Sequence, residues 1–359
     1  IARSQPVVGA RAAPLRPIRL MIVDDSLIAR SVLARLIEAG EDLEIVASLP
    51  GARQAIEALQ TETVDVILLD LEMPGMGGLE ALPLIIKAAR GARILVVSSH
   101  TAEGTEQTLS ALALGAADTL NKPDRGQFKG AYPEALLGKI RALARHATAP
   151  KPILAKAGSA HPLRTAPMTR PGILAIGAST GGIHAMRLLL DALPPPIGIP
   201  ILVTQHLPPQ FMPVFARQLE MASGYHTVVA EDEMPLTPDQ IIVAPGKAHL
   251  TICKQADRLQ VRLDSSKSVS GFTPSVDPMF ASVAEAFGRR ALGVLLSGMG
   301  RDGVIGAERI VEVGGTIMAQ DELSSSVWGM PRAAAEAGLA SAILPPDEIA
   351  GKIAASLRA

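Results

Sequence analysis

The residue of this sequence best placed to do chemistry is a serine between glycines. Ser179 lies in segment 177–182, which reads Gly-Ala-Ser-Thr-Gly-Gly and directly follows the apolar run 173–176. This pattern predicts a buried strand that turns tightly into a helix, with the hydroxyl at the rim of a sheet. Glycines on both sides let a ligand approach the backbone closely. The turn therefore suits either a nucleophile or a phosphate-binding loop.

A serine hydroxyl is a weak nucleophile unless a base takes its proton and a third group orients that base. Among the seven histidines, His206 is best placed to be the base, because it follows the apolar run 201–204 at the end of the next predicted strand. His184 lies one turn into the helix after Ser179 and is less well aimed, and His249 follows a candidate cleft loop. A structural histidine is the alternative role for His206.

The third member of such a triad is expected in the glycine-rich turn 297–303. Asp302 lies in this turn, which follows the predicted strand 292–296. The carboxyl ends of parallel strands share one edge of a sheet, where active sites of such sheets form. We therefore expect Ser179, His206 and Asp302 to lie close together.

The phosphate-loop alternative is disfavoured by what the glycine segments lack. Segment 177–182 is not a full dinucleotide fingerprint, and no strand-end acid about 20 residues further on suits the ribose role. Gly-Lys at 246–247 is followed by Ala248 instead of Ser or Thr, so it is not a Walker A loop. A serine nucleophile is the better interpretation.

A second group of reactive residues precedes this one in the chain. Asp24, Asp25, Asp70, Ser98 and Lys122 all follow or end predicted strands, so they are also expected to converge at one sheet edge. Clustered carboxylates suit Mg²⁺, which prefers hard oxygen ligands. Lys122 adds a positive charge for phosphate oxygens. Asp70 is then the carboxylate that would form an aspartyl phosphate.

The elements that must position these residues alternate between strands and helices. This alternation predicts an α/β protein with two doubly wound parallel sheets. Apolar and polar residues alternate in 259–263. This alternation predicts an antiparallel edge hairpin with 250–254 in the second sheet. The first sheet is expected to use strands at 19–23, 64–69, 94–97 and 117–120, and the second to use strands at 173–176, 199–204, 241–244, 292–296 and 316–319.

Composition supports two globular domains joined by a linker. The chain has 359 residues, of which 48% are hydrophobic and 19% charged, enough for two separate cores. We expect a disordered lead-in at 1–17, a first domain at 18–141, a proline- and alanine-rich linker at 142–171 and a second domain at 172–359. A net charge of -1 does not favour nucleic-acid binding, and the single cysteine, Cys253, excludes an internal disulfide. No apolar stretch is long enough to span a bilayer.

The first domain resembles a response-regulator receiver domain, which has a flavodoxin-like fold. The resemblance covers most of 18–141 and is carried by Asp-Asp-Ser at 24–26, Asp70 with Met-Pro at 73–74, Ser-Ser at 98–99 and Lys-Pro at 122–123. It implies that a histidine kinase, the chemotaxis kinase CheA, phosphorylates Asp70. It also implies that Asp24, Asp25 and Asp70 bind Mg²⁺ while Ser98 and Lys122 read the phosphorylated state. The sequence departs from the family pattern at Gly77, where Asp is frequent, and at Thr119, where an aromatic residue is usual.

The second domain resembles the Rossmann-like catalytic domain of the CheB family of protein-glutamate methylesterases. The resemblance covers 172–359 and is carried by the motifs at 177–182, 205–209, 244–249, 273–277, 297–303, 320–321 and 329–331. It implies that Ser179 is the nucleophile, His206 the general base and acid, and Asp302 the orienting carboxylate. Thr180 is expected to steady the imidazole, and the backbone N–H near Met299 to stabilise the oxyanion. The esterase chemistry needs no cofactor.

The domain order as a whole implies an enzyme of bacterial chemotaxis. By this resemblance the protein hydrolyses glutamate methyl esters on the cytoplasmic helices of chemoreceptors and deamidates receptor glutamines, under control of phosphorylation. It is expected to be a cytoplasmic monomer that does not insert into the membrane or bind nucleic acid. The alternative is a receiver-linked binding module that docks a receptor or kinase without catalysis.

Overall fold

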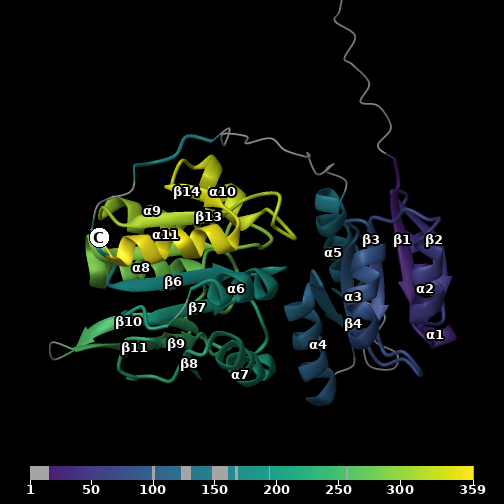
Figure 1. Cartoon of the computed structure of the whole chain (residues 1–359), viewed down its shortest axis with the longest axis horizontal. Coiled ribbons are helices and arrows are strands. Elements are labelled where there is room, and N and C mark those ends of the chain that lie inside the picture. Colours follow the sequence, from purple (N-terminus) through teal and green to yellow (C-terminus); the bar gives the residue numbers. More distant parts are fainter. Residues whose placement is uncertain are drawn as a thin grey trace, which may run out of the picture.

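Two α/β domains form the molecule, with their sheets in clearly different orientations (Figure 1). The computed structural model describes residues 16–98, 102–122, 131–147, 161–165, 169–193, 195–255 and 258–358. We refer to 18–147 as the N-terminal domain and to 173–358 as the C-terminal domain. The predicted lead-in 1–17 lies outside the described residues except for Arg16 and Pro17. In the predicted linker 142–171, residues 148–160 and 166–168 lie outside them as well.

The N-terminal domain has a five-stranded parallel sheet in the order β2-β1-β3-β4-β5. This is the flavodoxin-like order, so the predicted fold class is confirmed for this domain. Alternate residues of β1 point to opposite faces: Leu20 and Ile22 pack under α5, whereas Met21 and Val23 join the cluster under α2 and α3. The strands are β1 (Ile18–Val23), β2 (Leu43–Leu49), β3 (Val66–Asp70), β4 (Arg93–Ser98) and β5 (Asp118–Asn121). The helices are α1 (Leu27–Glu38), α2 (Ala52–Ala58), α3 (Gly78–Ala88), α4 (Ala102–Leu114) and α5 (Ala131–Ala147).

The C-terminal domain has a seven-stranded parallel sheet in the order β14-β13-β12-β6-β7-β9-β8. The strand order reverses beside β6. The strands that follow β6 in the chain are first added on its β7 side, and the later strands, from β12 on, are added on its other side. The strands are β6 (Ile173–Ala178), β7 (Ile201–Gln205), β8 (His226–Val229), β9 (Gln240–Val243), β12 (Ala291–Leu295), β13 (Thr316–Gln320) and β14 (Ala342–Leu344). The helices are α6 (Gly182–Asp191), η1 (Pro209–Phe211), α7 (Met212–Ser223), α8 (Val276–Phe287), η2 (Gly288–Arg290), α9 (Val304–Glu312), α10 (Met330–Glu336) and α11 (Pro346–Arg358).

The predicted hairpin is antiparallel, but it does not extend the edge of this sheet. Strands β10 (His249–Gln255) and β11 (Arg258–Asp264) pair as a separate two-stranded sheet, and β8 occupies the edge instead. The hairpin turns its apolar face inward, where Leu250, Ile252 and Val261 are buried in the same cluster as α8. Burial of that face explains why the hairpin lies over the domain.

The two domains share one continuous apolar cluster. Helix α4 packs against α6, α7 and η1, and the cluster includes Leu109 and Leu112 of α4 together with Ile183 of α6 (Figure 1). At the edge of this contact Arg93 donates to the backbone oxygen of Ser325 at 2.9 Å.

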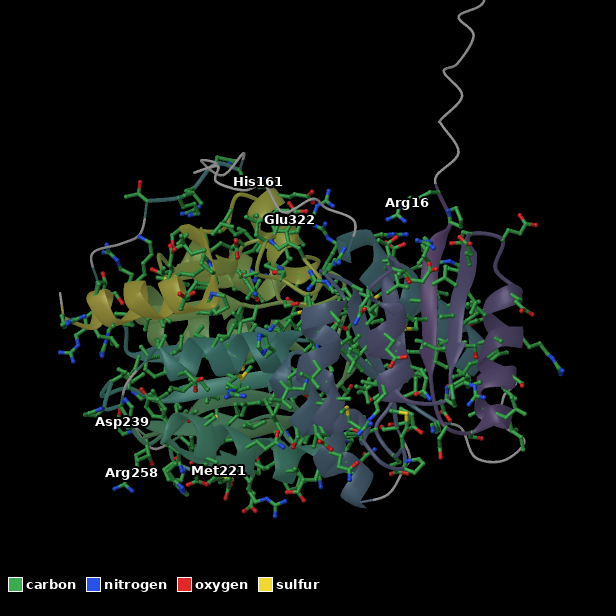
Figure 2. The ribbon with its side chains drawn as sticks, turned by 45° about the vertical axis from the view of Figure 1, so that its right-hand side comes forward. Arg16, His161, Met221, Asp239, Arg258 and Glu322 are labelled. Carbon is green, nitrogen blue, oxygen red and sulfur yellow. The ribbon has the colours of Figure 1, made fainter. Side chains whose placement is uncertain are left out.

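The residues around the predicted linker are more structured than the sequence indicates. Helix α5 runs to Ala147, beyond position 141, where we expected the first domain to end. Further along, the backbone N–H of Arg164 donates to the carbonyl of Ala340 at 3.0 Å. Figure 2 shows His161 beside the C-terminal domain, where its ring lies 5.8 Å from that of Trp328. Among the described residues, no helix combines the length and apolar character needed to cross a membrane.

Candidate active site

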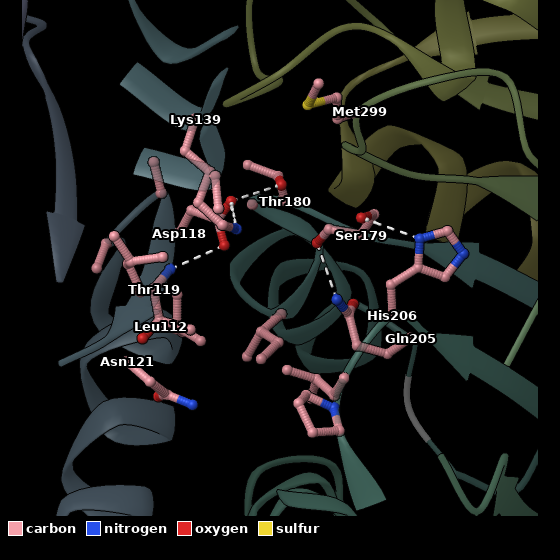
Figure 3. Close-up of a pocket in the computed structure, with 18 of the residues that line it drawn as sticks. Leu112, Asp118, Thr119, Asn121, Lys139, Ser179, Thr180, Gln205, His206 and Met299 are labelled. Carbon is pink, nitrogen blue, oxygen red and sulfur yellow. Dashed lines mark hydrogen bonds and ion pairs between the residues drawn. The ribbon is translucent and has the colours of Figure 1, made fainter. Parts of the chain in front are cut away.

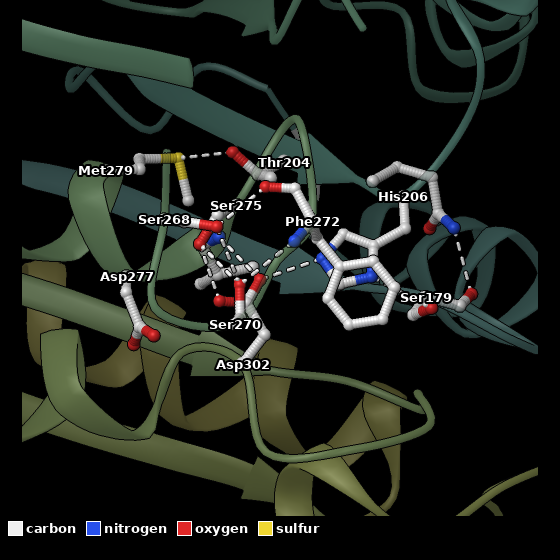
Figure 4. A network of polar contacts seen from close by, with 12 residues as sticks. Ser179, Thr204, His206, Ser268, Ser270, Phe272, Ser275, Asp277, Met279 and Asp302 are labelled. Atoms are coloured by element: carbon white, nitrogen blue, oxygen red, sulfur yellow. Dashed lines mark hydrogen bonds and ion pairs between the residues drawn. The ribbon is translucent and has the colours of Figure 1, made fainter. Parts of the chain in front are cut away.

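Three of the predicted site residues form one hydrogen-bonded chain. Nδ1 of His206 lies 3.2 Å from the Oγ of Ser179, and Nε2 of the same ring lies 2.8 Å from Oδ2 of Asp302 (Figure 4). The carboxylate can only accept, so Nε2 carries the ring proton and Nδ1 offers a lone pair to the serine hydroxyl. This is the order of hydroxyl, base and carboxylate that makes a serine nucleophilic.

The strand topology brings these three residues together. Ser179 follows β6, His206 follows β7, and Asp302 lies in the turn after β12, so all three are at carboxyl ends of adjacent strands. The site thus lies where the strand order reverses, which is the usual position of a ligand site in an open parallel sheet.

Asp302 is buried and receives hydrogen bonds from three donors. Besides His206, the hydroxyl of Ser275 donates to Oδ1 at 2.6 Å and the backbone N–H of Val276 donates to Oδ2 at 2.7 Å. Burial alone raises the pKa of this carboxyl group, but the three hydrogen bonds outweigh burial and hold its pKa well below the usual range. The carboxylate is therefore ionised whenever the imidazole acts as a base.

A second carboxyl group lies beside it and behaves in the opposite way. Asp277 accepts from the N–H of Gly306 at 2.9 Å, at the start of α9. Burial, together with the neighbouring Asp302, raises the pKa of Asp277 to about 6. Two adjacent carboxyl groups do not both ionise easily, so the site favours the charge on Asp302.

The backbone of Ser179 is held from both sides. The N–H of Ser179 donates to the carbonyl of Ser297 at 3.0 Å, and its carbonyl accepts from the amide of Gln205 at 2.9 Å. Two residues later Gly181 is the N-cap of α6 with φ at 76°, and a Cβ there would lie too close to the Cβ of Ser326. The glycine predicted to permit a tight turn is therefore required by backbone conformation and by space.

The predicted oxyanion donor lies on the turn that faces this serine. Gly298 accepts from the N–H groups of Gly329 and Met330, which fixes the turn, and a Cβ on Gly298 would lie 3.0 Å from the Cβ of Ser179. In the described part of the chain, the N–H of the next residue, Met299, has no hydrogen-bond acceptor. That N–H is consequently available to an oxygen bound next to the Ser179 hydroxyl.

The structure does not bring Thr180 to the imidazole, contrary to the sequence-based expectation. Its Oγ1 points to the opposite side of the turn and donates to Oδ2 of Asp118 on β5 at 2.8 Å (Figure 3). The same carboxylate oxygen accepts from Nζ of Lys139 at 2.6 Å. The hydroxyl thus links the two domains at the residue next to Ser179.

A cavity of about 1230 Å³ separates the domains at this point. Ser179, His206 and Met299 line one side, whereas Thr119 and Leu112 of the N-terminal domain line the other (Figure 3). The N-terminal domain therefore forms a wall of the space through which a substrate would reach the serine.

The predicted acidic group also assembles, at the carboxyl ends of β1 and β3. Asp24, Asp25 and Asp70 each offer an oxygen, and these atoms lie within 4.8 Å of one another. Lys122 Nζ lies 2.9 Å from Oδ2 of Asp24 and 2.7 Å from Oδ2 of Asp70. Burial by itself lowers the pKa of Lys122, but the two carboxylates outweigh burial and raise it. The oxygen-only donor set fits Mg²⁺.

Ser98 contacts Lys122 of this acidic group, and the two departures from the receiver pattern lie on other elements of the same domain. Ser98 is buried at the end of β4, opposite Asn121 of β5, and its carbonyl accepts from the N–H of Lys122 at 2.7 Å. Gly77 is the N-cap of α3, and Thr119 lies on β5 next to Asp118. Ser98 and Lys122 are therefore on adjacent strand ends, as the sequence predicts.

Several residues of the site could not be singled out from the sequence. Phe272 stacks on the His206 ring with centroids 4.3 Å apart and an interplanar angle of 19°. Ser275, Asp277 and Asp118 also contact the site residues. The motif at 273–277 marks the segment, but nothing in the sequence indicates that its hydroxyl reaches Asp302.

Two family models match this chain, one for each domain. The model described as CheB methylesterase matches residues 174–353. The model described as response regulator receiver domain matches residues 20–131.

Curated relatives share both parts. The chain is 41% identical over 347 residues to the protein-glutamate methylesterase/protein-glutamine glutaminase 2 of Caulobacter vibrioides, covering 95% of this chain and 99% of the relative. It is 38% identical to the protein-glutamate methylesterase/protein-glutamine glutaminase of Maricaulis maris, covering 94% of this chain and 95% of the relative. The crystal structure of the Thermotoga maritima CheB methylesterase catalytic domain superposes with a TM-score of 0.50 at 34% identity, covering 52% of this chain and 98% of that one.

Proposed function

The chain belongs to the CheB methylesterase family and carries a response regulator receiver domain, and from this premise we propose that it is a phosphorylation-regulated protein-glutamate methylesterase and protein-glutamine glutaminase. Its substrates are methylated glutamates and certain glutamines of chemoreceptors. The observation that carries the proposal is the hydrogen-bonded chain from Ser179 through His206 to Asp302 at the point where the strand order reverses.

In this mechanism Ser179 is the nucleophile. His206 Nδ1 takes the hydroxyl proton as Oγ attacks the ester carbonyl, and the charge on Asp302 stabilises the resulting imidazolium. The tetrahedral oxyanion accepts from the N–H of Met299, a kind of interaction that lowers the barrier by about 3–4 kcal/mol. His206 then returns its proton to the leaving methoxide, which releases methanol and leaves an acyl-enzyme.

Water completes the reaction by the same steps. His206 removes a proton from water as it attacks the acyl carbon, and Ser179 leaves with that proton, so the product is a glutamate. A glutamine side chain follows the same route with ammonia as the leaving group. None of these steps requires a group beyond this chain's own residues and water.

In the receiver domain we assign the phosphoryl acceptor to Asp70. Asp24 and Asp25, together with Asp70, would hold Mg²⁺, which neutralises the phosphoryl oxygens when bound. Lys122 pairs with the same carboxylates and is placed to contact the phosphoryl group, with Ser98 on the neighbouring strand end. The phosphodonor is a chemotaxis histidine kinase, CheA.

Regulation then follows from the wall that the receiver domain contributes to the cavity. A receptor segment would have to enter this cavity to reach Ser179, and movement of the receiver domain away from Ser179 would widen its path. Phosphorylation of Asp70 would favour the separated state if the phosphorylated receiver domain packs less well against the C-terminal domain than the unphosphorylated one does. Because both proposed partners present their reactive groups in the cytoplasm, the protein would act there, as a monomer.

Methanol release from methylated receptor tests the proposal. The full chain should release methanol faster with a small-molecule phosphodonor and Mg²⁺, and Ser179→Ala should abolish release in both states. Ser356→Ala, on α11, is a matched serine control that should keep the wild-type rate. A wild-type chain that binds receptor but releases neither methanol nor ammonia would instead favour the non-catalytic binding module.

A further inference from the structure

Ser275 occupies a helix cap but does not use its side chain as one. It is the N-cap residue of α8, yet its hydroxyl accepts no hydrogen bond from the first turn of that helix. A serine at this position ordinarily accepts from the N–H two or three residues later. Here Oγ instead donates to Oδ1 of Asp302 at 2.6 Å, while the N–H of Val276 donates to Oδ2 of the same carboxylate. Asp302 therefore takes over the contact with the helix N-terminus.

The carboxylate fixes the direction of the hydrogen bonds around Ser275. Because Asp302 only accepts, the Ser275 hydroxyl must donate to it, so Ser270 donates to Ser275 across 3.2 Å. The N–H of Phe272 in turn points to Ser270 Oγ at 3.4 Å. The segment 268–275 is thus connected to the carboxylate through hydroxyl groups (Figure 4).

The backbone of Ser275 is held equally firmly. Its N–H donates to Nδ1 of His249 at 2.9 Å, and Nε2 of that ring lies 2.8 Å from the carbonyl of Ser266. Ser275 and His249 are both fully buried. His249, which the sequence places after a candidate cleft loop, therefore serves to fix the serine beneath the Asp302 carboxylate.

These contacts also reach the imidazole. Phe272, on the same segment, stacks on His206, and Asp302 holds Nε2 of that ring. The segment consequently contacts both members of the pair, the ring through Phe272 and the carboxylate through Ser275. A carboxylate with donors on both oxygens cannot rotate without leaving a buried oxygen or donor unpaired, which is strongly unfavourable.

We propose that Ser275 is a positioning residue of the esterase reaction, whose hydroxyl holds the Asp302 carboxylate in the orientation that aims Oδ2 at His206. This inference rests on the proposed function. It assigns to Ser275 an effect on the rate of the chemical steps and not on substrate binding, because its side chain lies behind the carboxylate and away from the cavity.

The test compares three substitutions in the full chain by methanol release from methylated receptor. Ser275→Ala and Ser275→Cys remove or weaken the donor, and Ser275→Thr keeps a hydroxyl. We expect the first two to lower kcat about 10- to 100-fold, the factor for losing one hydrogen bond to a charged group, with KM within about twofold. Ser275→Thr should recover kcat to within about threefold of wild type.

The pH profile separates positioning from mere folding. The Ser275 hydroxyl places the positive end of its dipole beside the His206–Asp302 pair. Loss of this hydroxyl therefore favours the protonated form of the pair, so the acid limb of the pH profile of kcat should move to higher pH. Asp277 also faces Asp302 and titrates in this range, so the shift is taken as the difference from wild type. Thermal unfolding identifies any variant that does not fold, and Ser275→Cys keeps the side-chain size if Ser275→Ala fails.

Two results would overturn the inference. A folded Ser275→Cys with wild-type kcat and pH profile would show that the hydroxyl positions nothing. A loss of kcat with no shift of the acid limb and no recovery in Ser275→Thr would assign Ser275 a purely structural role. If the wild-type chain itself releases no methanol, the proposed function fails, which differs from an active wild type whose Ser275 variants are unaffected.

Discussion

Thr180 and Asp118 join the two domains through a hydrogen bond of 2.8 Å, one residue after Ser179. Asp118 begins β5, and Lys122, which pairs with Asp24 and Asp70, follows the end of that strand. One short strand therefore carries both a contact with the proposed phosphorylation site and a contact with the proposed esterase site. If phosphorylation displaces Lys122, as we propose, β5 connects that displacement to Asp118 and to the turn that holds Ser179.

Removal of this contact should increase esterase activity without phosphorylation. Asp118→Ala deletes the acceptor of Thr180 and the partner of Lys139. One such hydrogen bond contributes about 0.5–1.5 kcal/mol, so the rate of the unphosphorylated chain should rise about 2- to 10-fold if closure limits access. Methanol release without phosphodonor measures the effect.

The matched control for this prediction is Asp42→Ala. Asp42 also accepts from a basic side chain of α5, Arg141, but the pair is exposed on the receiver domain. Asp42→Ala should leave the rate of methanol release by the unphosphorylated chain unchanged. Equal rates for Asp118→Ala and wild type would show that this contact does not restrain the esterase.

The interdomain contact also shows where sequence reasoning stops. Parallel strands end at one edge, so the positions of Ser179, His206 and Asp302 along the chain were enough to predict their convergence. Thr180 lies next to Ser179, yet the partner of its hydroxyl comes from the other domain, and no pattern within either domain encodes that docking. The same limit applies to Ser275, because its hydrogen bond depends on the rotamer of a buried side chain.

Gly298 should tolerate no side chain. A Cβ at this position would lie 2.4 Å from Sδ of Met330 and 3.0 Å from the Cβ of Ser179. Gly298→Ala should therefore lower the free energy of unfolding by about 1–3 kcal/mol, the usual range for overpacking. Because the turn carries the N–H of Met299, kcat should fall by about 10-fold or more as well.

A glycine with free space around it provides the comparison. Gly351 lies in α11, and a Cβ added there would meet nothing within 4 Å. Gly351→Ala should raise the free energy of unfolding by about 0.5–1 kcal/mol and leave kcat unchanged. Denaturant unfolding and methanol release measure both quantities, and an equally stable, fully active Gly298→Ala would contradict the close approach.

The strands illustrate the same division between local and non-local information. The central strands of both sheets are apolar on both faces, so their sequences identify them directly. Strands β2, β8 and β14 were not predicted, because each lies at or near a sheet edge with partly exposed residues and a weaker pattern. The hairpin β10–β11 was identified by its alternation, but its position over α8 depends on which face of the domain it buries.

Asp277 should make stability decrease as pH rises through the mildly acidic range. Its pKa is raised from the ordinary value of 3.8 to about 6, so the folded chain holds this proton more tightly than the unfolded chain. The resulting stabilisation is complete below about pH 4 and is lost as pH rises to about 6. Asp277→Asn cannot ionise and should lack this component. Denaturant unfolding across the range measures it, and identical pH dependence in both proteins would refute the assignment.

Lys122 should compete with Mg²⁺ for the acidic group of the receiver domain. Its ammonium lies 2.9 Å from Oδ2 of Asp24 and 2.7 Å from Oδ2 of Asp70, the carboxylates proposed to hold the ion. Lys122→Ala removes this positive charge, so Mg²⁺ should bind more tightly, by about 3- to 10-fold at moderate ionic strength. Titration calorimetry with Mg²⁺ on the unphosphorylated chain measures the affinity directly. Lys139→Ala removes a lysine that pairs with Asp118 instead and should not change it, whereas weaker binding in Lys122→Ala would mean that the lysine organises the carboxylates for the ion.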